Sequence, residues 1–255
     1  MRTSRTSLAL LRPAAVLALL LPLLAGAAAP PAPTGTPRAS WVGSLDTAGR
    51  PTSLRVLDSG DGRQATLEFG EPYNCRLQAR RSPQADGRTT LALLEANGGP
   101  RCNRLNGGTA TLAADGTHAT LQLPGAAAAA ALWKPGQGAA ADSATAVTQG
   151  RWQTTVTGTD QWPIGLQLVL AAREPGDRGS ELAYASPRSC RVPLRHEGSD
   201  ARGSWYSVLP GNGGQACDRL LGQWLQVSAS DGAAQLSFQP GTGECVPACS
   251  LQRTP

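Results

Sequence analysis

The chain has 255 residues, and its 23 basic and 18 acidic side chains give a net charge of +5. Three of the basic residues, Arg2, Arg5 and Arg12, lie near the N-terminus, which leaves 20 against 18 in the rest of the chain. This near balance argues against a nucleic-acid-binding protein. Aromatic residues make up only 4%, so bulky core side chains are scarce.

The N-terminal segment has the pattern of a secretory signal peptide. Residues 1–27 combine a basic start, an apolar stretch over 14–24 and the small residues Ala25-Gly26-Ala27. We expect cleavage after residue 27 or 28 and no membrane insertion afterwards, which places the protein in a bacterial periplasm or outside the cell. Residues 28–38 are rich in proline and alanine and are expected to form a disordered leader.

A cysteine frame occurs twice in the remaining chain. Cys190 lies 115 residues after Cys75, and Cys217 lies 115 residues after Cys102. Six cysteines behind an export signal predict disulfide bonds formed in an oxidising compartment. The repeat favours one disulfide within each copy, worth about 3–4 kcal/mol in the chain-entropy model, and a local one in the tail: Cys75–Cys102, Cys190–Cys217 and Cys245–Cys249.

Short alternating segments separated by turn residues predict a first antiparallel β module over residues 39–135, with about seven strands. A flexible linker is expected over 136–149, because the stretch is rich in glycine, alanine and serine. Residues 150–241 repeat the order as a second β module, and 242–255 form a tail with the local disulfide. The fold class is therefore all-β: two tandem homologous modules, each a small barrel or sandwich.

Arginines beside the first cysteine of each copy are the candidate ligand-binding residues. Arg76 corresponds to Arg191 and Arg80 to Arg195, and alternation along a strand places each pair on one face. Such a basic stripe could hold a carboxylate, a phosphate or an acidic glycan. The alternative interpretation is a solvated strand face with local ion pairs. Trp162, beside Asp160 and Pro163, is the candidate aromatic for ligand stacking.

No catalytic residues are assigned. The chain has two histidines, His118 and His196, at positions that do not correspond in the repeat, and it lacks a Gly-x-Ser-x-Gly elbow. Neither a metal site nor a cofactor is expected, because the sequence carries no nucleotide or calcium motif and its cysteines are assigned to disulfides.

Each copy also carries a tryptophan, then an aromatic residue, Pro and Cys, then Gly and a second Cys. This pattern resembles small disulfide-stapled β modules of uncharacterised bacterial extracytoplasmic proteins, some of them fused to signalling kinases. The residues that carry the resemblance are Trp41, Phe69, Pro72, Cys75, Gly99 and Cys102, and Trp152, Tyr184, Pro187, Cys190, Gly214 and Cys217. It implies an exported β module and no particular activity.

The sequence thus favours an exported, non-enzymatic binding protein of the bacterial cell envelope, with an envelope polymer such as a glycan, or a periplasmic or secreted protein, as its partner. Two alternatives stay open at this point: an exported inhibitor of a hydrolase, and a secreted hydrolase.

Overall fold

A computed structural model describes residues 39–83, 86–138, 143–157, 161–211, 214–230, 233–240 and 245–254. The expected signal peptide and leader lie outside these ranges, as do residues 139–142 of the expected linker and residues 242–244 and 255 of the expected tail. Residues Thr36–Pro255 form one compact unit, which contains both β modules. In the part of the chain that is described, no helix has the length and apolar character needed to cross a membrane.

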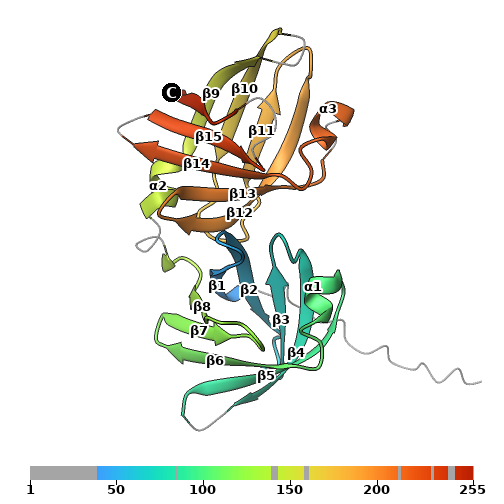
Figure 1. Ribbon diagram of the computed structural model, residues 1–255. Helices are drawn as coiled ribbons and strands as arrows, with labels where there is room; N and C mark the ends of the chain where they lie inside the picture. The colour runs from blue at the N-terminus through green and yellow to red at the C-terminus, as the bar shows by residue number, and fades with distance from the viewer. Residues whose placement is uncertain are drawn as a thin grey trace, which may run out of the picture. The chain divides into compact units, whose positions relative to one another are not determined.

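The first module is a closed barrel of antiparallel strands that follow one another in chain order (Figure 1). Its last strand pairs with its first, which completes the barrel. The strands are β1 (Ala39–Asp46), β2 (Pro51–Asp58), β3 (Gln64–Phe69), β4 (Cys75–Pro83), β5 (Arg88–Ala96), β6 (Thr109–Asp115), β7 (His118–Gln122) and β8 (Ala130–Trp133).

The second module repeats this topology, with β16 closing on β9. The strands are β9 (Gly150–Thr157), β10 (Pro163–Leu170), β11 (Ser180–Tyr184), β12 (Cys190–Asp200), β13 (Gly203–Val208), β14 (Trp224–Ser230), β15 (Ala233–Gln239) and β16 (Cys249–Thr254). The expected all-β fold with two homologous modules is confirmed, and both modules are barrels of eight strands rather than about seven.

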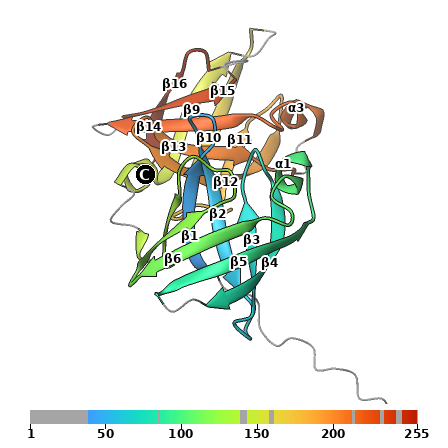
Figure 2. The same ribbon diagram turned by 60° about the horizontal axis from the view of Figure 1, so that its bottom comes forward.

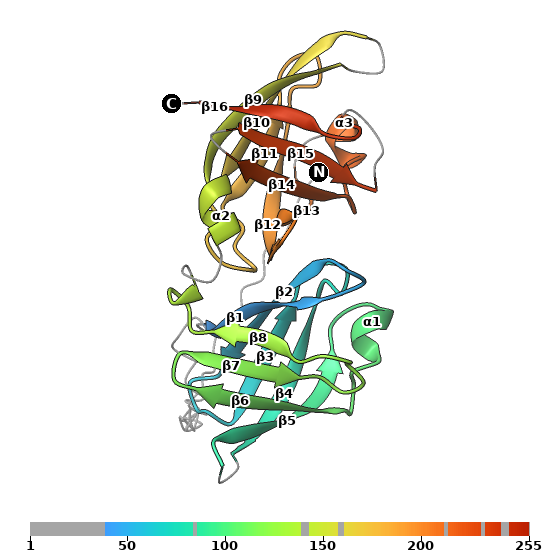
Figure 3. The same cartoon turned by 60° about the vertical axis from the view of Figure 1, so that its left-hand side comes forward.

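In each barrel the closing strand is the one that the sequence pattern does not indicate. β8 lies at the end of an alanine-rich stretch, and alanine has a low strand propensity. Its backbone pairs with β1 and β7 (Figure 3). It forms because this pairing is available and because Ala130 and Leu132 are buried in the barrel core. β16 occupies the corresponding place in the second barrel, so the segment expected to be a tail supplies a barrel strand.

Three short helices accompany the barrels: α1 (Pro100–Asn103), α2 (Ser143–Thr148) and α3 (Gly214–Asp218). α1 and α3 occupy equivalent places between the fifth and sixth strand of their barrels, and each carries the second cysteine of the frame (Figure 2). α2 lies in the expected linker and packs against β12, β13 and β14, where Thr145 and Thr148 are buried. That part of the linker is therefore a packed helix.

All three expected disulfides are present: Cys75–Cys102, Cys190–Cys217 and Cys245–Cys249. Inward-facing side chains alternate with outward-facing ones along the strands and fill each barrel. The core of the second barrel uses the larger side chains, among them Trp152, Tyr184, Tyr206 and Phe238. Trp41 and Trp152 are both buried and belong to the cores of their barrels.

Candidate functional site

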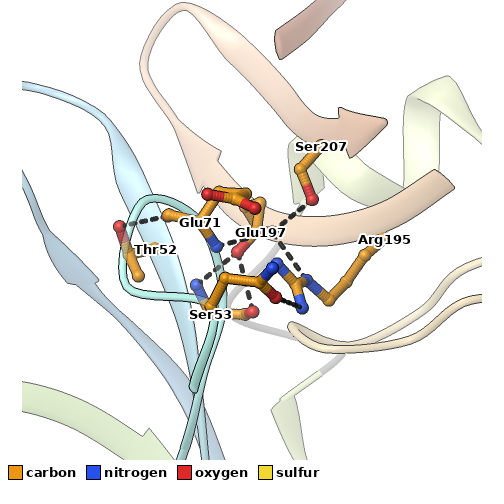
Figure 4. A network of polar contacts seen from close by, with 7 residues as sticks. Thr52, Ser53, Glu71, Arg195, Glu197 and Ser207 are labelled. Carbon is orange, nitrogen blue, oxygen red and sulfur yellow. Dashed lines mark hydrogen bonds and ion pairs between the residues drawn. The ribbon is translucent and has the colours of Figure 1, made fainter. Parts of the chain in front are cut away.

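The most unusual group in the described structure is the carboxylate of Glu197, which lies on β12 of the second barrel with an exposed fraction of 0%. A β-bulge between His196 and Gly198 interrupts the register of β12 at this position. A buried carboxylate is costly unless its charge is paired and its oxygens accept hydrogen bonds. Glu197 satisfies both conditions, and it does so with groups from both barrels (Figure 4).

Glu197 Oε2 accepts hydrogen bonds from two groups of Ser53 on β2, the backbone N–H at 2.9 Å and the hydroxyl at 2.7 Å. Its Oε1 accepts the backbone N–H of Glu71 at 3.2 Å. Within its own barrel, Glu197 Oε1 accepts hydrogen bonds from Arg195 Nε at 2.7 Å and from the Ser207 hydroxyl at 2.6 Å. Five donors therefore converge on one carboxylate, and three of them belong to the first barrel.

Gly70 makes this approach possible. A Cβ atom at this position would lie 1.7 Å from Glu197 Oε2, which is far inside van der Waals contact. The turn from β3 to β4 is fixed from the other side, because the Thr52 hydroxyl donates to the Glu71 carbonyl at 2.8 Å. Burial raises the pKa of Glu71, with nearby Glu197 adding to the rise and Arg195 opposing it.

The barrels also meet at the hairpin between β1 and β2. Arg50 lies over the ring of Trp224, 5.0 Å from its centroid, and Arg202 donates to the carbonyl oxygen of Gly49. The backbone N–H of Gly136 donates to the Glu174 carboxylate. These contacts add further links between the two barrels.

The contact between the barrels joins β12 of the second barrel to β2 and the β3–β4 turn of the first. The residues that make this contact are not repeated at the corresponding positions of the other barrel. At the constant offset of 115 residues, Glu197 corresponds to Ser82. On the receiving face, the backbone bond from Gly70 N to Ser53 O corresponds to the bond from Ala185 N to Gly165 O. The second barrel thus offers neither the Ser53 hydroxyl nor the space beside Gly70.

A cleft of ≈ 560 Å³ lies beside Glu197 and is lined by both barrels. Four arginines line it: Arg55 and Arg76 from the first barrel, and Arg178 and Arg195 from the second. The carboxylates that line it are Glu68 and Asp177. The rest of the wall is formed by the polar residues Ser53, Asn74 and Asn97 and by Phe69, Gly70, Cys75 and Gly176.

The four arginines identified as candidates from the sequence lie in different environments. Arg76 and Arg80 do share the outer face of β4, but only Arg76 lines the cleft, where it pairs with Glu68 at 2.6 Å. Arg80 is exposed and is not among the residues that line the cleft. Arg195 is 5% exposed and bonds Glu197.

Arg191 is exposed, pairs with Glu181 at 3.2 Å and lines a different cleft of ≈ 540 Å³ on the second barrel. Trp162 is 70% exposed and is not among the residues that line the arginine-lined cleft. Sequence reasoning missed Glu197, Ser53, Gly70 and Arg55. Glu197 stands two residues after Arg195, and this spacing is too common to mark a site.

The two histidines occupy contrasting environments. His196 is 0% exposed; its Nε2 lies 3.3 Å from the Thr145 hydroxyl and 3.5 Å from that of Ser199. The His196 imidazole is therefore within hydrogen-bond reach of two hydroxyl groups, but its side chain is closed to solvent. His118 is exposed, with Nδ1 3.2 Å from the Thr117 hydroxyl. Within the described ranges, no three His, Cys, Asp or Glu side chains are grouped so that they could hold a metal ion.

The fold and the site together define a tandem β-barrel protein whose barrels share a buried carboxylate and an arginine-lined cleft. Comparison with protein-family models, with curated proteins and with solved structures finds no match to this chain.

Proposed function

We propose that the protein is a non-enzymatic binding protein of the bacterial cell envelope, acting in the periplasm or after secretion, and that it holds an envelope polymer in the arginine-lined cleft. The three disulfides are consistent with an oxidising compartment. The resemblance to small extracytoplasmic β modules supports the same placement.

The observation that carries the proposal is the lining of the cleft. It combines four arginines with hydrogen-bonding groups of Ser53, Asn74 and Asn97, contributed by the two barrels. A polar cleft of this kind suits a hydrophilic, charged ligand better than an apolar one. It has no histidine among its lining residues, and His196 is enclosed elsewhere. These features favour binding over acid–base catalysis.

The test is co-sedimentation of the purified protein with isolated bacterial cell envelopes, at low and at high salt. We expect capture that weakens with salt, because screening reduces attraction between exposed charges. Arg76→Ala should reduce capture, while Arg80→Ala should not, since Arg80 lies on the same strand face but outside the cleft.

Equal capture of the wild type and both variants would remove the cleft as the binding site. The supernatant provides the control on catalysis: if reducing sugars or free amines accumulate there in proportion to added protein, the non-enzymatic assignment is wrong.

A further inference from the structure

The guanidinium of Arg195 is only partly used by the contact between the barrels. Its Nε bonds Glu197 Oε1 at 2.7 Å, and its Nη1 bonds Asn74 Oδ1 at 3.2 Å. Its Nη2 is buried and has no hydrogen-bond partner among the described residues. A buried N–H without an acceptor is costly, and natural proteins seldom leave one without a reason. Arg195 is 5% exposed and lines the cleft.

Arg55 shows the same deficit from the first barrel. Its Nε is buried without a partner in the described part of the chain, and no described carboxylate lies within ion-pair distance of it. Its aliphatic stem is held in place by the second barrel, because a Cβ on Gly176 would lie 2.5 Å from Arg55 Cδ. The position of this cation is therefore set by packing.

The two arginines line the same cleft, one from each barrel. Arg55 and Ser53 lie two residues apart on β2, so their side chains share a face and stand about 7 Å apart along the strand. Ser53 bonds Glu197, and Glu197 bonds Arg195. This chain of contacts links Arg55 to Arg195, and both side chains line the cleft.

Four arginines and two carboxylates line the cleft, and a third carboxylate, Glu197, pairs with Arg195. Glu68 is engaged by Arg76 at 2.6 Å. Asp177 Oδ2 accepts the backbone N–H groups of Arg173 and Glu174, each at 3.0 Å. Arg178, like Arg55, has no described carboxylate within ion-pair distance.

We propose that the cleft contains an oxyanion subsite, in which Arg55 and Arg195 donate hydrogen bonds to one carboxylate or phosphate group of the bound ligand. Guanidinium groups match the planar geometry of a carboxylate and the oxygens of a phosphate. The inference rests on the proposed function and deepens it, since it assigns the ligand an acidic group at this point.

The experiment is isothermal titration calorimetry of the full protein at constant ionic strength, with two acidic probes and their neutral parents. The carboxylate probe is glucuronate, compared with glucose; the phosphate probe is glycerol 1-phosphate, compared with glycerol. We expect at least one acidic probe to bind about tenfold or more tightly than its neutral parent, since each charge-assisted hydrogen bond is strong. The probe that binds more tightly identifies the kind of acidic group.

Variants locate the binding. Arg55→Gln removes the charge and should weaken the acidic probe about tenfold, whereas Arg80→Gln, an exposed arginine outside the cleft, should leave its Kd unchanged. Arg195→Lys keeps a cation beside Glu197 but lacks Nη2, and it should also weaken binding. Circular dichroism checks that each variant folds. If Arg55→Gln does not fold, Arg195→Lys serves as the test instead.

Two results would overturn the subsite: acidic probes that bind no better than their neutral parents, or an Arg55→Gln protein that binds them as the wild type does. The proposed function fails separately, through envelope capture that is equal in the wild type, Arg76→Ala and Arg80→Ala. Oxyanion binding without envelope capture would leave the subsite in place and remove the envelope polymer as the ligand.

Discussion

Replacement of Glu197 by alanine tests whether the buried carboxylate stabilises the contact between the barrels. The change removes the acceptor of five hydrogen bonds and leaves the guanidinium of Arg195 buried without its carboxylate. Removing one partner of a buried ion pair costs about 3–5 kcal/mol. The five bonds do not add independently, because they share one acceptor. We therefore expect a loss of about 3–5 kcal/mol in the free energy of unfolding.

Urea unfolding at neutral pH with disulfides intact is the measurement, followed by tryptophan fluorescence, since both barrels contain tryptophan. Glu181→Ala is the matched control: it removes a glutamate that pairs with Arg191 across the surface, where such a pair is worth about 0–1 kcal/mol. The double variant Glu197→Ala/Arg195→Met should recover part of the loss, because no unpaired charge then remains buried. A Glu197→Ala loss below about 1 kcal/mol, no larger than that expected for the surface pair, would refute the reasoning.

Three further predictions concern the same contact. Gly70→Ala should destabilise the protein by about 1–3 kcal/mol in urea unfolding, because its Cβ would overlap Glu197 Oε2, whereas Gly60→Ala, with open space around it, should be nearly neutral; equal effects would contradict this. Ser207→Ala should cost about 1.5–3 kcal/mol by the same measurement, since it removes a hydrogen bond to a buried charged group, and an unchanged urea midpoint would argue against that bond. Because the pKa of Glu71 is raised in the folded state, its ionisation opposes folding, and this cost disappears as the pH falls through that raised pKa toward 4.5. Glu71→Gln should therefore raise the urea midpoint at pH 7 and lose that advantage near pH 4, and a pH-independent difference would contradict the assignment.

Much of the fold could be predicted from the sequence, because local features specify it. The cysteine frame determined the disulfide pairing, and alternation with turn residues indicated most strands of each module. β8 and β16 were the exceptions. The residues of β8 are mostly alanine, which has a weak strand propensity, and β16 follows the proline-containing loop between Cys245 and Cys249. Both segments become strands because an open edge of the sheet is available to pair with them.

The site could be predicted only in part. Alternation correctly placed Arg76 and Arg80 on one face of β4, but it could not show that the second barrel leaves Arg80 outside the cleft. Glu197 meets Ser53 across 144 residues of chain, and no spacing rule connects positions so distant. By itself, the sequence determined two stapled β modules, since cysteine spacing and strand alternation are local properties. Only the tertiary structure decided that a glutamate of one barrel is buried against the other and that four arginines line the cleft beside it, because those contacts depend on how two separate barrel surfaces pack.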